Sequence, residues 1–331
     1  MRRGLAGPQE LHLGKRMINA VFHHPCGPWL RNRIAALQSE ELAIDIVAEA
    51  EGPALDRALA KADVLLHVLH PVTAAILTRA PNLKLIQKIG VGLDAIDLNA
   101  AAAQNIAVCN MPGTNTQAVV ELTLGLMLSV LRNIPELDHR LRTEVVWDLP
   151  PEAQGRFGEI AGKVVGLVGY GQVARRLAIV LEAIGATVLV HGRQPFRPDT
   201  GTFASKAELL ERADIISLHI PGTPETHHWI DAVAIERMKQ GAIIINTARG
   251  TIIDEAALLD ALASGHLAGA GLDVFANEPL GKGSPILSAP NLVALPHVAW
   301  LTRETLERSL KEARANIDQL RNGRPLRNQH L

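Results

Sequence analysis

The chain has 331 residues, of which 47% are apolar and 3% aromatic, and its formal net charge is −1. This length predicts two domains with substantial cores. Charges of both signs are dispersed, so no surface for nucleic acid is expected, and the absence of an apolar run of about 18 residues excludes a membrane span.

The cysteines and the first residues bear on the cellular compartment. Cys26 and Cys109 are the only cysteines, and their neighbours supply no metal-ligand spacing. We therefore expect neither a disulfide framework nor a metal site, and a cytoplasmic protein. Residues 1–16 are basic and mixed, without the apolar stretch of a signal peptide, and the sequence leaves open whether they are a tag or a tail.

Short apolar runs alternate with amphipathic stretches along the first third of the chain. Strands are predicted at 18–22, 44–47, 64–68, 85–89 and 106–109, and helices at 31–38, 53–60, 73–79 and 98–104. This alternation predicts an α/β fold with a parallel sheet and right-handed crossovers.

A long helix is predicted at 115–131. It is apolar on nearly every side, with Val119, Leu122, Leu126 and Val130 among its residues, so burial on most faces is expected. The surface that covers it is either the rest of the chain or a second subunit.

A second alternating series begins at Lys163. Strands are predicted at 164–168, 187–191, 215–219, 242–246, 268–272 and 292–295, and helices at 173–184 and 254–264. A last amphipathic helix is predicted at 304–320, and it ends at Asn322-Gly323 with Pro325 beyond, which is typical of a helix C-terminus.

A glycine-rich loop follows the first strand of this series. Gly169 allows a tight turn, Gly171 lets the backbone approach a pyrophosphate, and Ala174 permits close packing of helix on strand. Gln172 and Val173 open the helix, whose N-terminus offers N–H groups to phosphates. Because the motif lies between a strand and a helix, it predicts a dinucleotide site.

The next strand bears on which dinucleotide binds. An acidic residue is expected about 20 residues further on if the ribose 2′-hydroxyl is to be held. Residues 188–194 contain no carboxylate, and Gly192 and Arg193 stand there instead. An arginine can pair with a 2′-phosphate, so NADP is favoured and NAD remains possible, with Arg193 then a solvated loop residue.

Three further segments place a polar residue at or just after a strand end. Arg249 lies in 246–250, Glu278 in 272–279 and His297 in 295–300. The carboxyl ends of parallel strands are where ligands bind. An arginine can hold the carboxylate of a 2-oxo acid, a histidine can exchange a proton with its carbonyl oxygen, and a carboxylate can stabilise the imidazolium. This chemistry requires no metal.

Together with the glycine loop and Lys88–Asp94, these segments resemble the D-isomer-specific 2-hydroxyacid dehydrogenase family over nearly the whole chain after Met17. The resemblance implies that Arg249 binds substrate, that Glu278 supports His297, and that His297 is the acid/base. It also implies that the backbone of Val91 and Gly92 holds the substrate carboxylate, with Trp300 either a wall of the substrate pocket or a core residue. The residues that it places along the cofactor are Pro221, Thr226, Thr247, Ala248 and Asp273.

The family fold has two doubly wound parallel-sheet domains. A Rossmann cofactor domain, here 114–300, is inserted into a flavodoxin-like substrate domain, here 17–113 with 301–331, and the active site lies in the cleft between them. The helix at 115–131 resembles the family's dimer-forming element, so a homodimer is expected. His67 and His70, near a strand end, either face this cleft or pack inside the domain.

The segment 191–194 looks most like glyoxylate and hydroxypyruvate reductases that use NADPH, and Glu278 argues against formate dehydrogenases. We therefore expect an oxidoreductase for a small 2-oxo acid and D-2-hydroxy acid. A dinucleotide-sensing binding protein of the same fold and an enzyme for another donor, such as phosphite, are the alternatives. The sequence does not identify the hydroxy acid or the physiological direction.

Overall fold

The computed structural model describes residues 16–145 and 147–331. The predicted tag or tail therefore lies almost wholly outside the described residues. The chain divides into two compact units. One comprises the described residues up to Asn115 together with Thr302–Leu331, and the other is Thr116–Leu301. The sequence predicts the domain boundaries between residues 113 and 114 and between residues 300 and 301.

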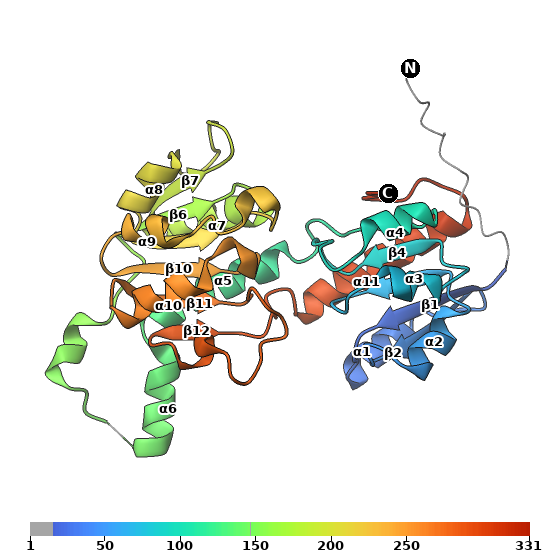
Figure 1. The fold of residues 1–331 in the computed structure, drawn as a ribbon, viewed down its shortest axis with the longest axis horizontal. Coiled ribbons are helices and arrows are strands. Elements are labelled where there is room, and N and C mark those ends of the chain that lie inside the picture. Colours follow the sequence, from blue (N-terminus) through green and yellow to red (C-terminus); the bar gives the residue numbers. More distant parts are fainter. Residues whose placement is uncertain (1–15, 146) are drawn as a thin grey trace. The chain divides into compact units, whose positions relative to one another are not determined.

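The first unit contains a five-stranded parallel sheet with the strand order β2-β1-β3-β4-β5 (Figure 1). This is the flavodoxin-like doubly wound order. The strands are β1 (Ile18–His23), β2 (Leu42–Val47), β3 (Val64–His67), β4 (Leu85–Lys88) and β5 (Ala107–Cys109).

The helices of this unit are α1 (Pro28–Ala35), α2 (Pro53–Leu59), α3 (Ala74–Thr78), α4 (Leu98–Ala103) and α11 (Arg303–Arg321). Helices α2, α3 and α4 share one apolar core with the strands, in which Leu55, Leu77 and Ala101 are fully buried. Helix α11 returns to β4 from the end of the chain, where Asn316 Nδ2 donates to Gln87 Oε1 at 2.6 Å. The buried amide pair fixes the C-terminal helix on the N-terminal sheet.

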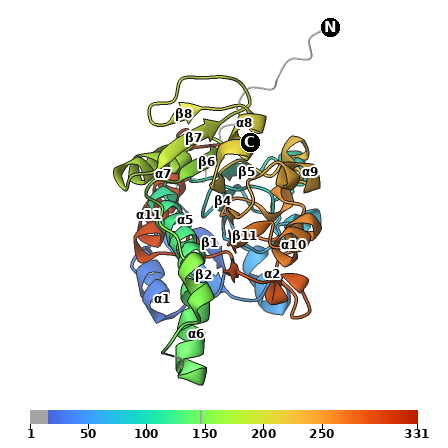
Figure 2. The same ribbon diagram turned by 90° about the vertical axis from the view of Figure 1, so that its left-hand side faces the viewer.

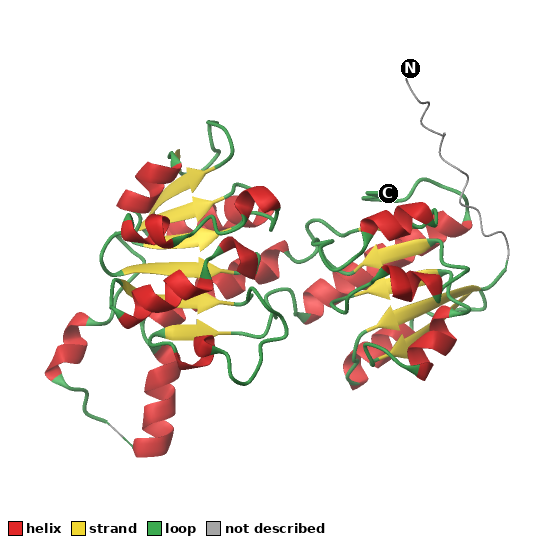
Figure 3. Ribbon diagram, viewed as in Figure 1, coloured by secondary structure: helices red, strands yellow, loops and turns green. Residues whose placement is uncertain are grey.

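The second unit contains a seven-stranded parallel sheet with the order β12-β11-β10-β9-β6-β7-β8 (Figure 3). Its strands are β6 (Val164–Val168), β7 (Thr187–His191), β8 (Thr202–Phe203), β9 (Ile215–Leu218), β10 (Ala242–Asn246), β11 (Leu267–Leu272) and β12 (Leu292–Ala294). This is the Rossmann order with one added strand, and the strand order reverses between β6 and β9. The predicted fold class is confirmed.

This unit contains six described α-helices. They are α5 (Thr116–Leu131), α6 (Ile134–Glu144), α7 (Gln172–Ala183), α8 (Lys206–Arg212), α9 (Ala232–Glu236) and α10 (Glu255–Ala263). All of them except α6 contribute to the apolar cores on the sheet. One core cluster contains residues of α5 and α7, and a second contains residues of α8, α9 and α10. Gly166 and Gly271 lie where a Cβ would approach Leu209 and Leu126 to 2.8 Å and 3.0 Å, so these helices pack closely on the strands.

Helix α5 is only partly buried within the single chain, and its cover by a second subunit, the other alternative, remains a prediction. Its sheet-facing residues are buried, whereas Glu121, Gly125 and Leu128 are exposed. Helix α6 has no buried residue and extends from the end of α5 away from the sheet of its unit (Figure 2). Within the described residues, no single helix has the length and hydropathy of a membrane span, and only α5 and α6 taken together, bent by 59°, meet that test.

All the predicted strands and helices are present, with ends shifted by up to three residues. Helix α1 begins at Pro28 rather than at Arg31, because proline is well suited to the first helical turn. The helices α6, α8 and α9 and the strand β8 were not predicted. Helix α8 has a capping box formed by Ser205 and Glu208, a sequence signal that could have identified it.

Candidate active site

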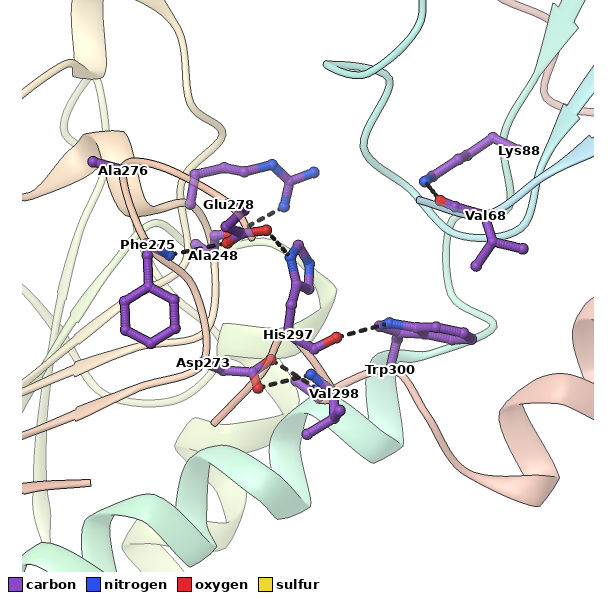
Figure 4. Close-up of polar contacts among 12 residues, drawn as sticks. Val68, Lys88, Ala248, Asp273, Phe275, Ala276, Glu278, His297, Val298 and Trp300 are labelled. Atoms are coloured by element: carbon purple, nitrogen blue, oxygen red, sulfur yellow. Dashed lines mark hydrogen bonds and ion pairs between the residues drawn. The ribbon is translucent and has the colours of Figure 1, made fainter. Parts of the chain in front are cut away.

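Three neighbouring strands end at the site. Arg249 follows β10, Glu278 follows β11 and His297 follows β12, and these strands are adjacent and parallel. The side chains therefore meet at the carboxyl edge of one sheet, as the sequence predicts. Figure 4 shows Glu278 and His297 directed toward each other.

Glu278 and His297 form the central pair. His297 Nδ1 lies 2.6 Å from Glu278 Oε2, and Phe275 N–H donates to Glu278 Oε1 at 2.9 Å. Burial raises the pKa of Glu278, but the hydrogen bonds from His297 and Phe275 outweigh burial and hold it below its usual value. An ionised carboxylate only accepts hydrogen bonds, so Nδ1 carries the proton and Nε2 is left for chemistry.

The backbone at His297 is in the left-handed region, with φ of 55°. This conformation is costly for a residue other than glycine and persists only where its surroundings impose it. Buried Asp273 accepts hydrogen bonds from Val298 N–H and Ala299 N–H, both at 2.8 Å, and Trp300 Nε1 donates to the His297 carbonyl at 3.0 Å. These contacts fix the loop that carries His297.

Asp273 and Trp300 thus make contacts that the sequence analysis did not predict. Burial raises the pKa of Asp273, although the N–H groups of Val298 and Ala299 act in the opposite direction. The predicted contacts of Asp273 with a cofactor and of Trp300 with a substrate remain predictions. Their observed contacts hold the His297 loop.

Arg249 is held beside Glu278 by a close approach of two backbones. A Cβ on Gly250 would lie 1.8 Å from the carbonyl carbon of Phe275, so only glycine permits the segment after β10 to touch the segment after β11. The charge of Arg249 also contributes to lowering the Glu278 pKa, after the hydrogen bonds from His297 and Phe275. The three residues identified from sequence are therefore brought together.

Asn246 is a positioning residue that sequence reasoning missed. It is fully buried at the end of β10, its Nδ2 donates to the Arg249 carbonyl at 2.8 Å, and Ala248 N–H donates to its Oδ1 at 3.0 Å. The amide closes the turn that presents Arg249. A polar residue that ends an otherwise apolar buried strand was the available signal.

The glycine loop has the geometry that a pyrophosphate requires. Gly169 has φ of 96°, and a Cβ there would lie 2.5 Å from the His219 carbonyl oxygen. Gly171 caps α7, no side chain caps this N-terminus, and a Cβ on Gly171 would meet no atom within 4 Å. Ala174 is fully buried. The free N–H groups of α7 lie beside the point where the strand order reverses, so these residues fit a dinucleotide.

The other predicted cofactor residues lie on turns of the same unit. Thr226 Oγ1 donates to the Pro221 carbonyl at 2.6 Å, and the hydroxyls of Thr247 and Thr123 are 3.0 Å apart. Ala248 is held by Asn246, as described above. These contacts order the loops after β9 and β10.

Further predicted cofactor residues lie at the start of α7 and after β7. Gln172 Oε1 accepts from the Thr116 hydroxyl at 3.2 Å, and Val173 is half-buried. Gly192 and Arg193 directly follow β7, and Arg193 is exposed. Their contact with a cofactor remains a prediction.

Val91 and Gly92 belong to the first unit, in the segment after β4. Asn110 Nδ2 donates to the Val91 carbonyl at 2.9 Å, and the Val91 side chain is exposed. Their part in substrate binding stays a prediction. His67, at the end of β3, is fully buried, with Nε2 2.6 Å from the His70 carbonyl oxygen, so it packs inside the unit.

Potential metal ligands do not come together as a metal site in the part of the chain that the structure describes. No group of three or more histidine, cysteine or acidic residues there has a geometry that could hold a metal ion. Cys26 and Cys109 are both free thiols, and burial raises the pKa of Cys109 to about 12.

Known proteins are similar to this chain along most of its length. The family model described as D-isomer specific 2-hydroxyacid dehydrogenase, NAD binding domain, matches residues 124–299. A glyoxylate reductase of Thermofilum pendens is 40% identical over 263 residues, covering 77% of this chain and 77% of that protein. A D-3-phosphoglycerate dehydrogenase of Mycobacterium tuberculosis is 41% identical over 267 residues, which are 78% of this chain but 50% of that protein.

A solved structure gives the same result for the fold. The TT0316 protein from Thermus thermophilus has a TM-score of 0.84 and 35% sequence identity, with 94% of this chain and 99% of that chain covered. The fold and the site define a dinucleotide-binding α/β protein. The chain belongs to the D-isomer specific 2-hydroxyacid dehydrogenase family, which confirms the resemblance that its motifs indicate.

Proposed function

We propose that the protein is an NADP-dependent reductase of a small 2-oxo acid, of the glyoxylate or hydroxypyruvate type, which forms the D-2-hydroxy acid. The observation that carries this proposal is the Glu278–His297 pair, with His297 Nδ1 2.6 Å from Glu278 Oε2, beside Arg249 on the sheet that also bears the glycine loop. The similarity to a glyoxylate reductase supports the substrate class.

The residues of this chain have separate parts in the reaction. The nicotinamide, when bound, supplies the hydride to the carbonyl carbon or accepts it in the reverse direction. His297 Nε2 gives a proton to the carbonyl oxygen, and Glu278 stabilises the imidazolium through Nδ1. Arg249 pairs with the substrate carboxylate through two N–H groups, and the backbone of Val91 and Gly92 is proposed to bind the same carboxylate.

The NADP preference is proposed from the segment that follows β7. It has Gly192 where an acid would bind the ribose 2′-hydroxyl, followed by the exposed Arg193. We expect the apparent affinity for NADPH to exceed that for NADH. A clear preference for NADH would contradict this part of the proposal.

We propose that Thr116–Leu301 binds the dinucleotide, that the other unit contributes to substrate binding, and that the protein is a cytoplasmic homodimer. The dimer is supported by apolar side chains exposed on α5 and beyond α6, where Leu128 is 39%, Val145 78% and Trp147 85% exposed. Such surfaces commonly bind another protein chain. Sedimentation that shows only monomer would contradict the dimer.

The enzyme proposal is tested by NADPH oxidation with a panel of 2-oxo acids. We expect turnover with glyoxylate or hydroxypyruvate, and its loss in His297→Ala and Arg249→Ala. A dinucleotide sensor would need no acid/base pair, so it would give no turnover with any member of the panel. Full activity in His297→Ala would also overturn the assigned mechanism.

A further inference from the structure

Gly192 lies at the end of β7, where an acidic side chain would reach the ribose of NAD. Its backbone does not require glycine, because its φ is outside the left-handed region. A Cβ added there would nevertheless lie 2.8 Å from Phe196 Cε1 and 3.4 Å from Phe196 Cδ1. The next nearest atom, the Gln194 carbonyl oxygen, is at an ordinary contact distance of 3.8 Å. The ring of Phe196 alone excludes a side chain at residue 192.

The ring of Phe196 is held in place by other aromatic residues. Its centroid lies 5.3 Å from that of Tyr170 and 5.5 Å from that of Phe203, the latter edge-on. Such pairs are favourable beyond the area that they bury. Tyr170 is anchored in turn, because its hydroxyl donates to the Thr200 carbonyl and accepts from Thr200 N–H, both at 2.9 Å. Moving the ring would disturb the whole loop between β7 and β8.

The charged residues of the loop between β7 and β8 also favour a phosphorylated dinucleotide. Arg193 and Arg197 are both exposed on it, and its one acidic residue, Asp199, is paired with Arg175. A ribose 2′-phosphate at the end of β7 would thus meet the exposed Arg193 next to residue 192 and no competing carboxylate at residue 192 itself. Arginines of this kind bind phosphate through paired N–H groups.

We propose that Phe196 is a cofactor-specificity residue: its ring fills the side-chain space of residue 192, keeps an acid away from the end of β7, and so commits the site to the phosphorylated dinucleotide. The inference rests on the proposed NADP preference. It adds that the preference depends on the Gly192–Phe196 pair, so an acid introduced at residue 192 cannot act while the ring is present.

The steric part is tested first on the protein without cofactor, by thermal melting. Gly192→Ala should lower Tm by roughly 3–10 °C, because overpacking of this kind is destabilising. In a Phe196→Ala background the same change should lower Tm by less than about a third of that. Gly283→Ala is the matched control, because no atom lies within 4 Å of a Cβ there, and it should leave Tm unchanged.

The functional part uses Gly192→Asp with and without Phe196→Ala, and measures Kd for NADPH and NADH. Gly192→Asp alone should weaken the binding of both cofactors. The double variant should bind NADH about 10–100-fold more tightly than Gly192→Asp alone, since a charged hydrogen bond to the ribose becomes possible.

The proposal is overturned if Gly192→Ala costs the same in both backgrounds, or if Gly192→Asp gains NADH binding with Phe196 present. A wild-type preference for NADH would instead refute the proposed NADP dependence. The melting experiment does not depend on the cofactor preference. It still decides whether the Phe196 ring leaves no room for a side chain at residue 192.

Discussion

Replacing Glu278 with glutamine removes the negative charge of the Glu278–His297 pair and keeps the shape of the side chain. Glu278 Oε1 can still accept from Phe275 N–H as an amide oxygen, but an NH₂ group then faces His297 Nδ1, where Oε2 now lies at 2.6 Å. The imidazolium that donates the proton in reduction loses its neighbouring negative charge. We therefore expect the main effect on the reaction rate and a smaller one on folding.

The expected loss in kcat/KM can be estimated from the strength of the Glu278–His297 hydrogen bond and from how exposed the two side chains are. A hydrogen bond to a charged group contributes about 1.5–3 kcal/mol, and the lower half of that range applies because the two side chains are 26% and 34% exposed. A loss of about 1.5–2 kcal/mol of transition-state stabilisation lowers kcat/KM by about 10–30-fold. The pH profile of reduction should also move to lower pH.

The assay is steady-state reduction of glyoxylate by NADPH from about pH 5.5 to about pH 9. The control is Glu255→Gln, because Glu255 Oε1 likewise accepts a backbone N–H, from Ala276 at 2.6 Å, but does not contact His297. The reasoning is refuted if Glu278→Gln retains wild-type kcat/KM and pH profile, or if Glu255→Gln loses as much.

Three further predictions concern the folding of the site, the reaction rate and the acid stability of the chain. Gly250→Ala should prevent formation of the site, since its Cβ would lie 1.8 Å from a backbone carbon of Phe275; a soluble variant with wild-type Tm would contradict this. Trp300→Phe removes the indole hydrogen bond to the His297 carbonyl, so kcat should fall several-fold, by about 1 kcal/mol, with Tm nearly unchanged; equal kcat would show that the bond is dispensable. Burial, with the charge of Lys88 second, lowers the pKa of His67 to about 3, so the unfolded chain takes up a proton below about pH 6.5 that the folded chain does not. The free energy of unfolding therefore decreases, on the order of a few kcal/mol, as the pH falls from about 6.5 toward 3. The melting temperature of His67→Gln should depend less on pH than that of wild type. An identical pH dependence would refute the lowered pKa of His67 as its cause.

The sheets and the main site residues could be predicted because they obey local rules. Central parallel strands are buried on both faces and therefore appear as short apolar runs, such as Val164–Val168. The glycine loop is recognisable because Gly169 and Gly171 each satisfy a distinct backbone requirement. Arg249, Glu278 and His297 were found because each follows the end of a predicted parallel strand, although they are far apart in sequence.

The remaining features depend on contacts that a single sequence does not display. The overlap of the Phe196 ring with the side-chain space of Gly192 requires the path of the loop between β7 and β8. The role of Asp273 as the acceptor of two N–H groups depends on the left-handed turn at His297. Helix α6, by contrast, carries Ile134, Leu137 and Leu141 at the i, i+3 and i+7 spacing of an amphipathic helix, a signal that could have predicted it, although the helix buries no residue in the chain.

The central claim is tested most directly by the stereochemistry of the product. Hydroxypyruvate should be reduced by the wild-type protein with NADPH, the glycerate formed should be the D enantiomer, and His297→Ala should form it at a rate reduced by about 100-fold or more. Formation of the L enantiomer, or equal rates for wild type and His297→Ala, would contradict the account.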